Sequence, residues 1–294
     1  MNSLPVASSV LAVCAHPDDE SFGLGATLAA FADRGTPTAV LCLTHGAASA
    51  LGTSRGDLHQ ARATELAAAA RELGVGDVEL LDYPDGALAQ EPAELLIGHV
   101  QQAAARANAS LLLVFDEGGI TGHPDHQQAT RAARLFAGHS GLPVLAWTVE
   151  QHVAATLNAE FGTSFVGRPA DQIDCCVEVD RQRQLAAITC HASQARDNPV
   201  LWRRLELQGN REVFRWLDRA DENRSRASER RKDALAAVGA ACALPGEPSG
   251  GCHHGPPGHD ELGRNARGPA SVNTPGGIKT GRGLQGGRSW QPSS

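Results

Sequence analysis

Up to about residue 150, short apolar runs alternate with longer segments of helical periodicity. The apolar runs end at polar, Gly or Pro residues, which is typical of strands buried on both faces of a sheet. They are Val10–Ala15, Thr38–Thr44, Val78–Tyr83, Leu111–Phe115 and Val144–Val149. The helical segments are Glu20–Arg34, Asp57–Leu73, Pro92–Ala107 and Asp125–Ala137. This alternation predicts βαβ units, and therefore a Rossmann-like α/β fold whose mostly parallel sheet is flanked by helices on both faces.

Beyond residue 150 the pattern weakens. Asp174–Val179 is predicted to be another strand, and Arg181–Cys190 and Arg211–Arg219 are predicted to be helices. From Pro245 to Ser294 the chain has 13 Gly and 7 Pro in 50 residues and almost no apolar periodicity. Such a segment buries too little surface to offset the entropy lost on ordering. We therefore expect one folded domain over residues 1–240 and a Gly/Pro-rich, disordered tail over residues 241–294.

Composition and charge narrow the class of protein. The 294 residues carry a net charge of −7, which argues against nucleic-acid binding because that function needs a basic face. No apolar stretch is long enough for a membrane helix, and the N-terminus lacks the basic region of a signal peptide. The seven cysteines are scattered, and Cys14, Cys42, Cys175 and Cys176 lie in apolar runs. These features predict a reduced, cytoplasmic protein that does not act on membranes.

Two strand ends hold most of the candidate chemistry. The first strand leads into His16-Pro17-Asp18-Asp19-Glu20, and the fourth strand leads into a loop that contains Gly122-His123-Pro124-Asp125-His126. In the common doubly wound topologies, strands one and four are neighbours where the strand order reverses, and ligands bind at their carboxyl ends. We therefore expect the two loops to face each other across one crevice.

The residue types in these loops suit a divalent metal. Two imidazoles and one carboxylate are typical of a catalytic Zn²⁺ site with a position open for water, and Fe²⁺ takes the same set. Asp19, Glu20 and Asp125 could equally cap helices, so either loop alone has a purely structural interpretation. Both loops together favour the metal site. Asp18 and His123 then remain as a base for the water and a donor for the oxyanion.

These segments resemble the signatures of the PIG-L/LmbE-type deacetylases, which are metal-dependent enzymes that remove acetyl from N-acetylglucosamine-containing substrates. Further similar segments bring the resemblance to about residues 8–200; they are Arg62–Leu66, Leu73–Val75, Tyr83–Gly86, Gln184–Ala187 and His191–Gln194. The resemblance implies an amidohydrolase that removes an acyl group, in relatives acetyl, from a small-molecule N-acyl amino sugar with Zn²⁺ (or Fe²⁺) as cofactor.

The resemblance also implies roles for individual residues. His16, Asp19 and His126 match the metal ligands. Asp18 matches the base that activates the metal-bound water, and His123 matches the residue that stabilises the oxyanion.

The resemblance also implies roles for residues around the metal ligands. Arg62 and Asp85 match positions that hold sugar hydroxyls or a phosphate in relatives. Asp125 matches a residue that orients His123 or a ligand, and we expect Glu20 to accept backbone amides at the start of the first helix. The chain departs at Thr121, where some sugar deacetylases have an aromatic residue, and this leaves the exact substrate open.

The sequence is also compatible with functions other than sugar deacetylation. An amidase that cleaves a larger amide conjugate is the nearest alternative. Asp18 and His123 argue against a catalytically silent metal- or sugar-binding module, which needs neither a base nor an oxyanion donor. Gly23 and Gly25 lack the strand–glycine turn of a dinucleotide site and instead suggest close packing on the sheet. The sequence leaves a homo-oligomer open.

Overall fold

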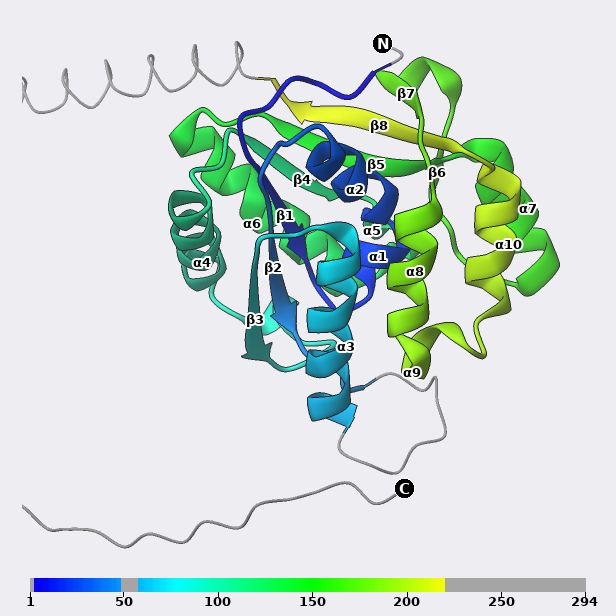
Figure 1. The fold of residues 1–294 in the computed structure, drawn as a ribbon, viewed down its shortest axis with the longest axis horizontal. Helices are drawn as coiled ribbons and strands as arrows, with labels where there is room; N and C mark the ends of the chain where they lie inside the picture. The colour runs from blue at the N-terminus through cyan, green and yellow to red at the C-terminus, as the bar shows by residue number, and fades with distance from the viewer. Residues whose placement is uncertain (1–2, 49–57, 220–294) are drawn as a thin grey trace, which may run out of the picture. The chain divides into compact units, whose positions relative to one another are not determined.

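A computed structural model describes residues 3–48 and 58–219 of the chain (Figure 1). The expected tail at residues 241–294 lies outside the described residues. The described part contains one eight-stranded sheet in the order β3-β2-β1-β4-β5-β8-β7, with the short β6 paired to β5. The strands are β1 (Val10–Cys14), β2 (Thr38–Thr44), β3 (Asp77–Tyr83), β4 (Leu111–Phe115), β5 (Val144–Glu150), β6 (Gly167–Arg168), β7 (Cys175–Glu178) and β8 (Arg211–Asp218).

The sheet is mostly parallel and mixed at one edge. Strands β3, β2, β1, β4 and β5 pair in parallel, and β6 pairs in parallel with β5. Strand β8 runs antiparallel to both β5 and β7. The predicted α/β fold with a mostly parallel sheet is confirmed.

Helices cover both faces of the sheet, as predicted. Helices α4 (Ala93–Arg106) and α6 (Pro124–Ser140) pack on one face, and α2 (Gly25–Asp33), α3 (Leu58–Leu73) and α8 (Gln182–Cys190) lie on the other (Figure 1). The remaining helices are α1 (Asp19–Phe22), α5 (Gly119–Gly122), α7 (Gln151–Phe161), α9 (Ala192–Ala195) and α10 (Pro199–Gln208), with 3₁₀ turns at Leu88–Gln90 and Ala170–Gln172.

The two-sided cover explains why the central strands β1, β2 and β4 are almost entirely apolar. In β1, Val10, Ala12 and Cys14 pack into the core beneath α2 and α3. The alternating residues Leu11 and Val13 pack into the core beneath α4 and α6. Because side chains alternate between the faces of a strand, a strand covered on both sides needs apolar residues at every position.

Two of the predicted elements are wrong in detail. Arg211–Arg219, predicted as a helix, is strand β8, because the gap between β5 and β7 supplies hydrogen-bonding partners on both of its edges. The predicted helix Glu20–Arg34 is divided into α1 and α2. At the break, a Cβ on Gly23 would lie 2.3 Å from Cε1 of Phe115, so the backbone approaches the sheet more closely than a side chain allows.

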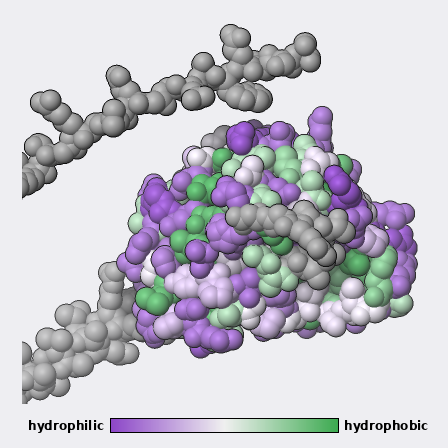
Figure 2. Space-filling model, turned by 90° about the horizontal axis from the view of Figure 1, so that it is seen from below, coloured by the Kyte–Doolittle hydropathy of each residue, from purple (hydrophilic) through white to green (hydrophobic). Residues whose placement is uncertain are grey.

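The cysteines, the helices and the surface can be compared with the expectations from composition. Cys14, Cys42 and Cys175 are buried, and Cys176 is half-buried. Within residues 3–48 and 58–219, no helix has the length and apolar character needed to cross a bilayer. Seen from the side to which the arrowheads of β2 and β3 point, the described surface mixes hydrophilic and hydrophobic residues (Figure 2).

Candidate metal centre

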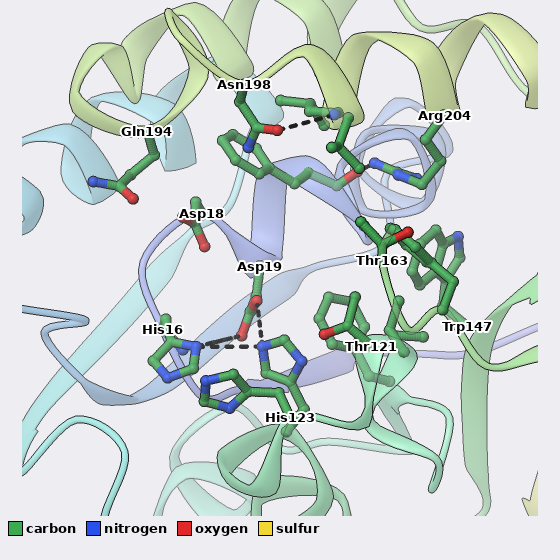
Figure 3. Close-up of a pocket in the computed structure, with 18 of the residues that line it drawn as sticks. His16, Asp18, Asp19, Thr121, His123, Trp147, Thr163, Gln194, Asn198 and Arg204 are labelled. Atoms are coloured by element: carbon green, nitrogen blue, oxygen red, sulfur yellow. Dashed lines mark hydrogen bonds and ion pairs between the residues drawn. The ribbon is translucent and has the colours of Figure 1, made fainter. Parts of the chain in front are cut away.

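The loops that follow β1 and β4 meet at the carboxyl edge of the sheet. The two strands are direct parallel neighbours, with Val10 opposite Leu111 and Ala12 opposite Leu113. His16 and Asp19 follow β1, while His123 and His126 follow β4 on the start of α6. Figure 3 shows His16, Asp19 and His123 gathered at the same place. The predicted crevice between the two loops is present.

Three side chains converge there at metal-ligand spacing. Nδ1 of His16 lies 3.3 Å from Nε2 of His126, and Oδ1 of Asp19 lies 3.1 Å from the same Nε2. Oδ2 of Asp19 is 3.9 Å from Nδ1 of His16. Ligands bound tetrahedrally to zinc at about 2.0–2.2 Å are about 3.3 Å apart, so these three side chains fit such an ion.

The outer nitrogens of both imidazoles are held by oxygen atoms. Nε2 of His16 lies 3.1 Å from Oδ1 of Asp85 and 3.3 Å from Oδ2 of Asp125. Nδ1 of His126 lies 3.0 Å from the carbonyl oxygen of Gly119. Carboxylates and carbonyls only accept hydrogen bonds, so these ring nitrogens donate. The facing nitrogens, Nδ1 of His16 and Nε2 of His126, therefore keep their lone pairs for a metal in the neutral rings.

Other groups with metal-ligating atoms also converge. His16, His123 and His126 form one such group, and His16 with Asp85 and Asp125 forms another. In the second group Asp125 also accepts from the amides of Gly86, at 2.7 Å, and Leu88. The second group therefore acts as the support of the His16 ring. A third group, His45, His59 and Asp82, lies outside the pocket described below.

The charges around the imidazoles favour positive charge at this point. Burial lowers the pKa of His16, but hydrogen bonds to Asp125 and Asp85 outweigh it and raise the pKa to about 10. Burial also opposes protonation of His126, yet its pKa is raised by Asp19. For Asp19, burial is outweighed by His126 and His16, which hold its pKa well below the usual range. Protons and metal ions compete for such a site.

Asp18 is held by two partners beside these ligands. Its Oδ2 accepts from Nη2 of Arg62 at 2.7 Å, and its backbone N–H donates to Oε2 of Glu20 at 2.9 Å. Burial raises the pKa of Asp18 to about 6, and the nearby Arg62 opposes this increase. The carboxyl group is therefore set to exchange a proton near neutral pH.

Arg62 and Asp85 have contacts that differ from the predicted sugar contacts. The Arg62 guanidinium is 2% exposed and donates to the carbonyl oxygens of Gly46 and Pro17 as well as to Asp18. Asp85 contacts His16 and accepts from the amide of Ala48 at 2.8 Å. Both residues line the pocket, but their described contacts support Asp18 and His16.

Glu20 lies behind the site in a buried network. Its carboxylate accepts the Asp18 amide, as predicted, and also the hydroxyl of Ser21 at 2.6 Å. Its Oε1 lies 2.6 Å from Nε2 of His191, and both side chains are fully buried. This partner is 171 positions away, so no local pattern in the sequence could indicate the pair.

His123 is oriented by the start of α6. Its Nδ1 accepts from the backbone N–H of Asp125 at 3.2 Å, so the neutral ring carries its proton on Nε2. Burial and the neighbouring imidazoles of His126 and His16 lower the pKa of His123. The ring is thus a neutral donor with its proton on Nε2. The only tyrosine, Tyr83, contacts His99 instead of the pocket.

Backbone strain occurs in both loops. Asp18 has φ 111° and Ile120 has φ 62°, and only one other described non-glycine residue, Asn108, has a positive φ. Ile120 is β-branched, which makes this conformation especially unfavourable. Its carbonyl accepts from the amide of Val166 at 2.7 Å, and such supporting contacts hold the strained segment in place. Strained backbone of this kind clusters at functional sites.

A pocket of about 480 Å³ opens over these residues. One side is polar, with Asp18 and Gln194, and the other side holds Trp147 and Arg204 (Figure 3). Sequence reasoning missed the residues of this second side. They come from α1, β4, β5 and α10, which no single motif connects, and they include Phe22, Phe115, Trp147, Leu201 and Arg204.

Comparisons with known proteins find sugar deacetylases among the relatives of this chain. The family model described as GlcNAc-PI de-N-acetylase (PIG-L) matches residues 11–137. The chain is 30% identical over 215 residues to the probable N-acetyl-alpha-D-glucosaminyl L-malate deacetylase 2 of Bacillus anthracis, with 71% of this chain and 92% of that protein covered. It is 38% identical over 162 residues to the 1D-myo-inositol 2-acetamido-2-deoxy-alpha-D-glucopyranoside deacetylase of Streptomyces griseus, with 47% of this chain and 50% of that protein covered.

A solved structure with the same fold has another activity. The 4-carboxy-2-hydroxymuconate hydratase of Pseudomonas putida matches with a TM-score of 0.55 and 19% identity, covering 73% of this chain and 97% of that chain. This likeness shows the fold alone. Because one fold can hold several chemistries, the reaction has to be argued from the residues of the site.

Proposed function

The chain belongs to the family of the GlcNAc-PI de-N-acetylases (PIG-L), and from this premise we propose that it is a metal-dependent amidohydrolase of N-acylated amino sugars. The bond cleaved is the amide between an acyl group and the nitrogen of a glucosamine-type substrate. The relatives named above are deacetylases of N-acetylglucosamine derivatives, and the proposed reaction class is the same.

One observation supports this proposal more than any other. Nδ1 of His16 and Nε2 of His126 face each other at 3.3 Å, while the other nitrogen of each ring is held by oxygen acceptors. Imidazoles that support a metal ion are typically fixed in this way. In the proposal, Asp19 completes the ligand set through Oδ1, because its Oδ2 accepts from the amides of Ala15 and His16.

The ligand chemistry favours zinc as the resident metal, with iron(II) as the alternative. Two imidazoles and one carboxylate are used by both ions. A divalent ion held by His16, Asp19 and His126 would lower the pKa of a water molecule and polarise the substrate carbonyl.

The other polar residues act on the proton and the developing charge. Asp18 takes the proton from the attacking water, because its pKa of about 6 keeps it mainly ionised at neutral pH. Arg62 holds the Asp18 carboxylate at 2.7 Å and keeps it directed into the pocket. His123 donates from Nε2 to the carbonyl oxygen as negative charge develops there. The C–N bond then breaks, and the amine leaves with a proton.

The test uses the full-length, zinc-loaded protein and the methyl glycoside of N-acetylglucosamine. We expect equal amounts of acetate and free amine. Asp18→Asn should keep its zinc but lose about 10²–10⁴-fold in kcat, because it removes a positioned base. His126→Ala should lose zinc, whereas His139→Ala, an exposed histidine on the same helix, should keep both metal and activity.

Two results would reject the proposal. If no free amine appears from any N-acylated glucosamine while the protein is fully loaded with zinc, the chain is a binding module. If His126→Ala retains its zinc, the assigned ligand set is wrong. A larger amide conjugate as substrate is the alternative within the same class, and the apolar side of the pocket bears on it.

A further inference from the structure

The pocket has a wall that neither metal binding nor hydrolysis requires. A row of flat groups leads away from the metal ligand His126. The rings of His126 and Phe115 have centroids 5.0 Å apart, and those of Phe115 and Trp147 are 5.3 Å apart. The guanidinium carbon of Arg204 lies 5.0 Å from the centroid of Trp147. The row therefore runs from the reacting centre to a cation, and all four residues line the pocket.

Arg204 is a buried cation without a carboxylate partner. It is 4% exposed, and its guanidinium donates to Oε1 of Gln208 and to the carbonyl oxygen of Phe22. Both acceptors are neutral. No carboxylate in residues 3–48 and 58–219 lies within the 4.0 Å that defines an ion pair with Arg204.

The acid whose charge acts on Arg204 is already paired. Glu212 influences Arg204, but its two oxygens accept from Nη1 of Arg181 and Nε1 of Trp147, each at 2.5 Å. Burial lowers the pKa of Arg204 to about 10, so the side chain remains protonated at neutral pH. A buried charge is costly unless an opposite charge and hydrogen bonds compensate it. The pocket is where such an anion can reach Arg204.

The two sides of the pocket indicate which half of the substrate reaches this cation. A sugar exposes hydroxyl groups, which need polar partners, and Asp18 and Gln194 line one side of the pocket (Figure 3). An acyl chain needs an apolar wall, and Phe22 and Phe115 supply one. Trp147 also borders the pocket, but it is 1% exposed and serves as backing for Phe115. With the reacting carbonyl at His126, the acyl chain lies along the aromatic row. Figure 3 shows Gln194 and Arg204 on opposite sides of Asp19.

We propose that the acyl group removed by this enzyme is that of a dicarboxylic acid, so that the substrate is its half-amide. The carbon chain packs against Phe115, and the terminal carboxylate pairs with Arg204. This inference rests on the proposed function and specifies its substrate class. In the reaction, a C–O bond forms from water and the C–N bond breaks. The products are a dicarboxylate and a free amine, with no change of oxidation state.

The alternative role of Arg204 is purely structural: its guanidinium donates to the carbonyl oxygen of Phe22 and so links α1 to α10. That role needs hydrogen-bond donors but gives no preference between charged and neutral acyl groups. A comparison of two acyl groups on one enzyme therefore separates the two roles, because any loss of folded protein affects both substrates equally.

The experiment measures kcat/KM on the zinc-loaded, full-length protein for matched pairs of methyl glucosaminides. In each pair, one glucosaminide is N-acylated with glutaric, adipic or pimelic acid through one carboxyl group, so that the other carboxylate is free. The second glucosaminide has the same acyl chain, but its terminal carboxylate is replaced by a neutral carboxamide. For at least one length, we expect the acid to be preferred by about 10- to 100-fold, because hydrogen bonds to a charged group contribute that much.

Variants of Arg204 assign the preference to this side chain. Arg204→Met should reduce the acid-to-amide ratio to within about twofold of unity, and Arg204→Lys should keep part of it. Arg203→Met is the matched control on the same helix, since Arg203 pairs with Glu160 and Glu206, and it should keep the full ratio.

Several outcomes overturn the inference while the proposed function stands. They are hydrolysis of the N-acetyl substrate with no acid preference at any length, and an unchanged ratio in Arg204→Met. A third is an Arg204-dependent preference for a carboxymethyl over a methyl glycoside of N-acetylglucosamine, which would place the sugar's substituent at Arg204. If the zinc-loaded protein hydrolyses none of the N-acyl substrates, both the inference and the proposed function are wrong.

Discussion

Nδ1 of His16 lies 3.3 Å from Nε2 of His126, although the two residues are 110 positions apart in the chain. Oxygen acceptors hold the other nitrogen of each ring, so in neutral rings two lone pairs face each other. Lone pairs at this distance repel unless a cation or a proton lies between them. Each ring position is fixed from behind, by Asp85 and Asp125 for His16 and by Gly119 for His126.

The support of His16 predicts an effect on metal affinity. Asp125→Asn removes the charge that holds Nε2 of His16, and we expect zinc affinity to fall about 10- to 100-fold, as for other residues that orient a ligand. Competition with a chelator of known affinity measures the change. Asp171→Asn, an exposed carboxylate on a 3₁₀ turn, is the control and should bind zinc normally. An unchanged affinity in Asp125→Asn would contradict this role.

The raised pKa of Asp18 predicts the pH dependence of the reaction. The base must be ionised, so kcat/KM should fall about tenfold per unit as the pH decreases through the pKa of Asp18. Burial raises that pKa to about 6, and a cation bound beside the carboxylate would lower it. The acid limb should therefore lie at or below pH 6, measured with zinc content checked at each pH. A limb centred above pH 7 would assign it to another group.

Arg62 should act through Asp18. Arg62→Met removes the guanidinium that lowers the pKa of Asp18, so the acid limb should move to higher pH and kcat should fall more than KM rises. Arg62→Lys should restore part of the profile. Arg71→Met, an exposed position on the same helix, is the control. A change confined to KM, with the pH profile unmoved, would instead indicate direct contact with the substrate.

The close approach of Gly23 to the sheet predicts a stability difference. A Cβ at Gly23 would lie 2.3 Å from Cε1 of Phe115, so Gly23→Ala should lower the free energy of unfolding by about 1–3 kcal/mol through overpacking. Gly98→Ala, inside α4, has nothing within 4 Å and should stabilise by about 0.5–1 kcal/mol. Chemical denaturation measures both. Equal effects of the two substitutions would show that the Phe115 contact is unimportant.

Local patterns were sufficient for the central part of the fold. Strands β1, β2, β4 and β5 were predicted because each is buried on both faces, and this burial requires a nearly continuous apolar run. The edge strand β3 is only partly buried. Strand β8 was mistaken for a helix because its short sequence fits either period, and only the partners β5 and β7 determine its conformation. The break at Gly23 likewise depends on the position of Phe115, which lies on a distant strand.

The candidate site was predictable for a related reason. His16 and Asp19 directly follow β1, and His126 lies on the segment that follows β4, at the start of α6. Strands that neighbour each other bring their following segments together. Arg62 and Asp85 were assigned to the substrate, because a sequence does not show that a guanidinium is directed at Asp18 or that a carboxylate is directed at His16.

The sequence by itself determined the alternation of strands and helices, the two loops with metal-ligating residues and the class of reaction to expect. These features depend on neighbouring residues and on simple periodicity. The tertiary structure alone decided which nitrogen of each imidazole is free and that Arg204 is buried beside Trp147 without a carboxylate partner among the described residues. Such relationships join side chains from distant segments, and their energies depend on burial and direction, which exist only after the chain has folded.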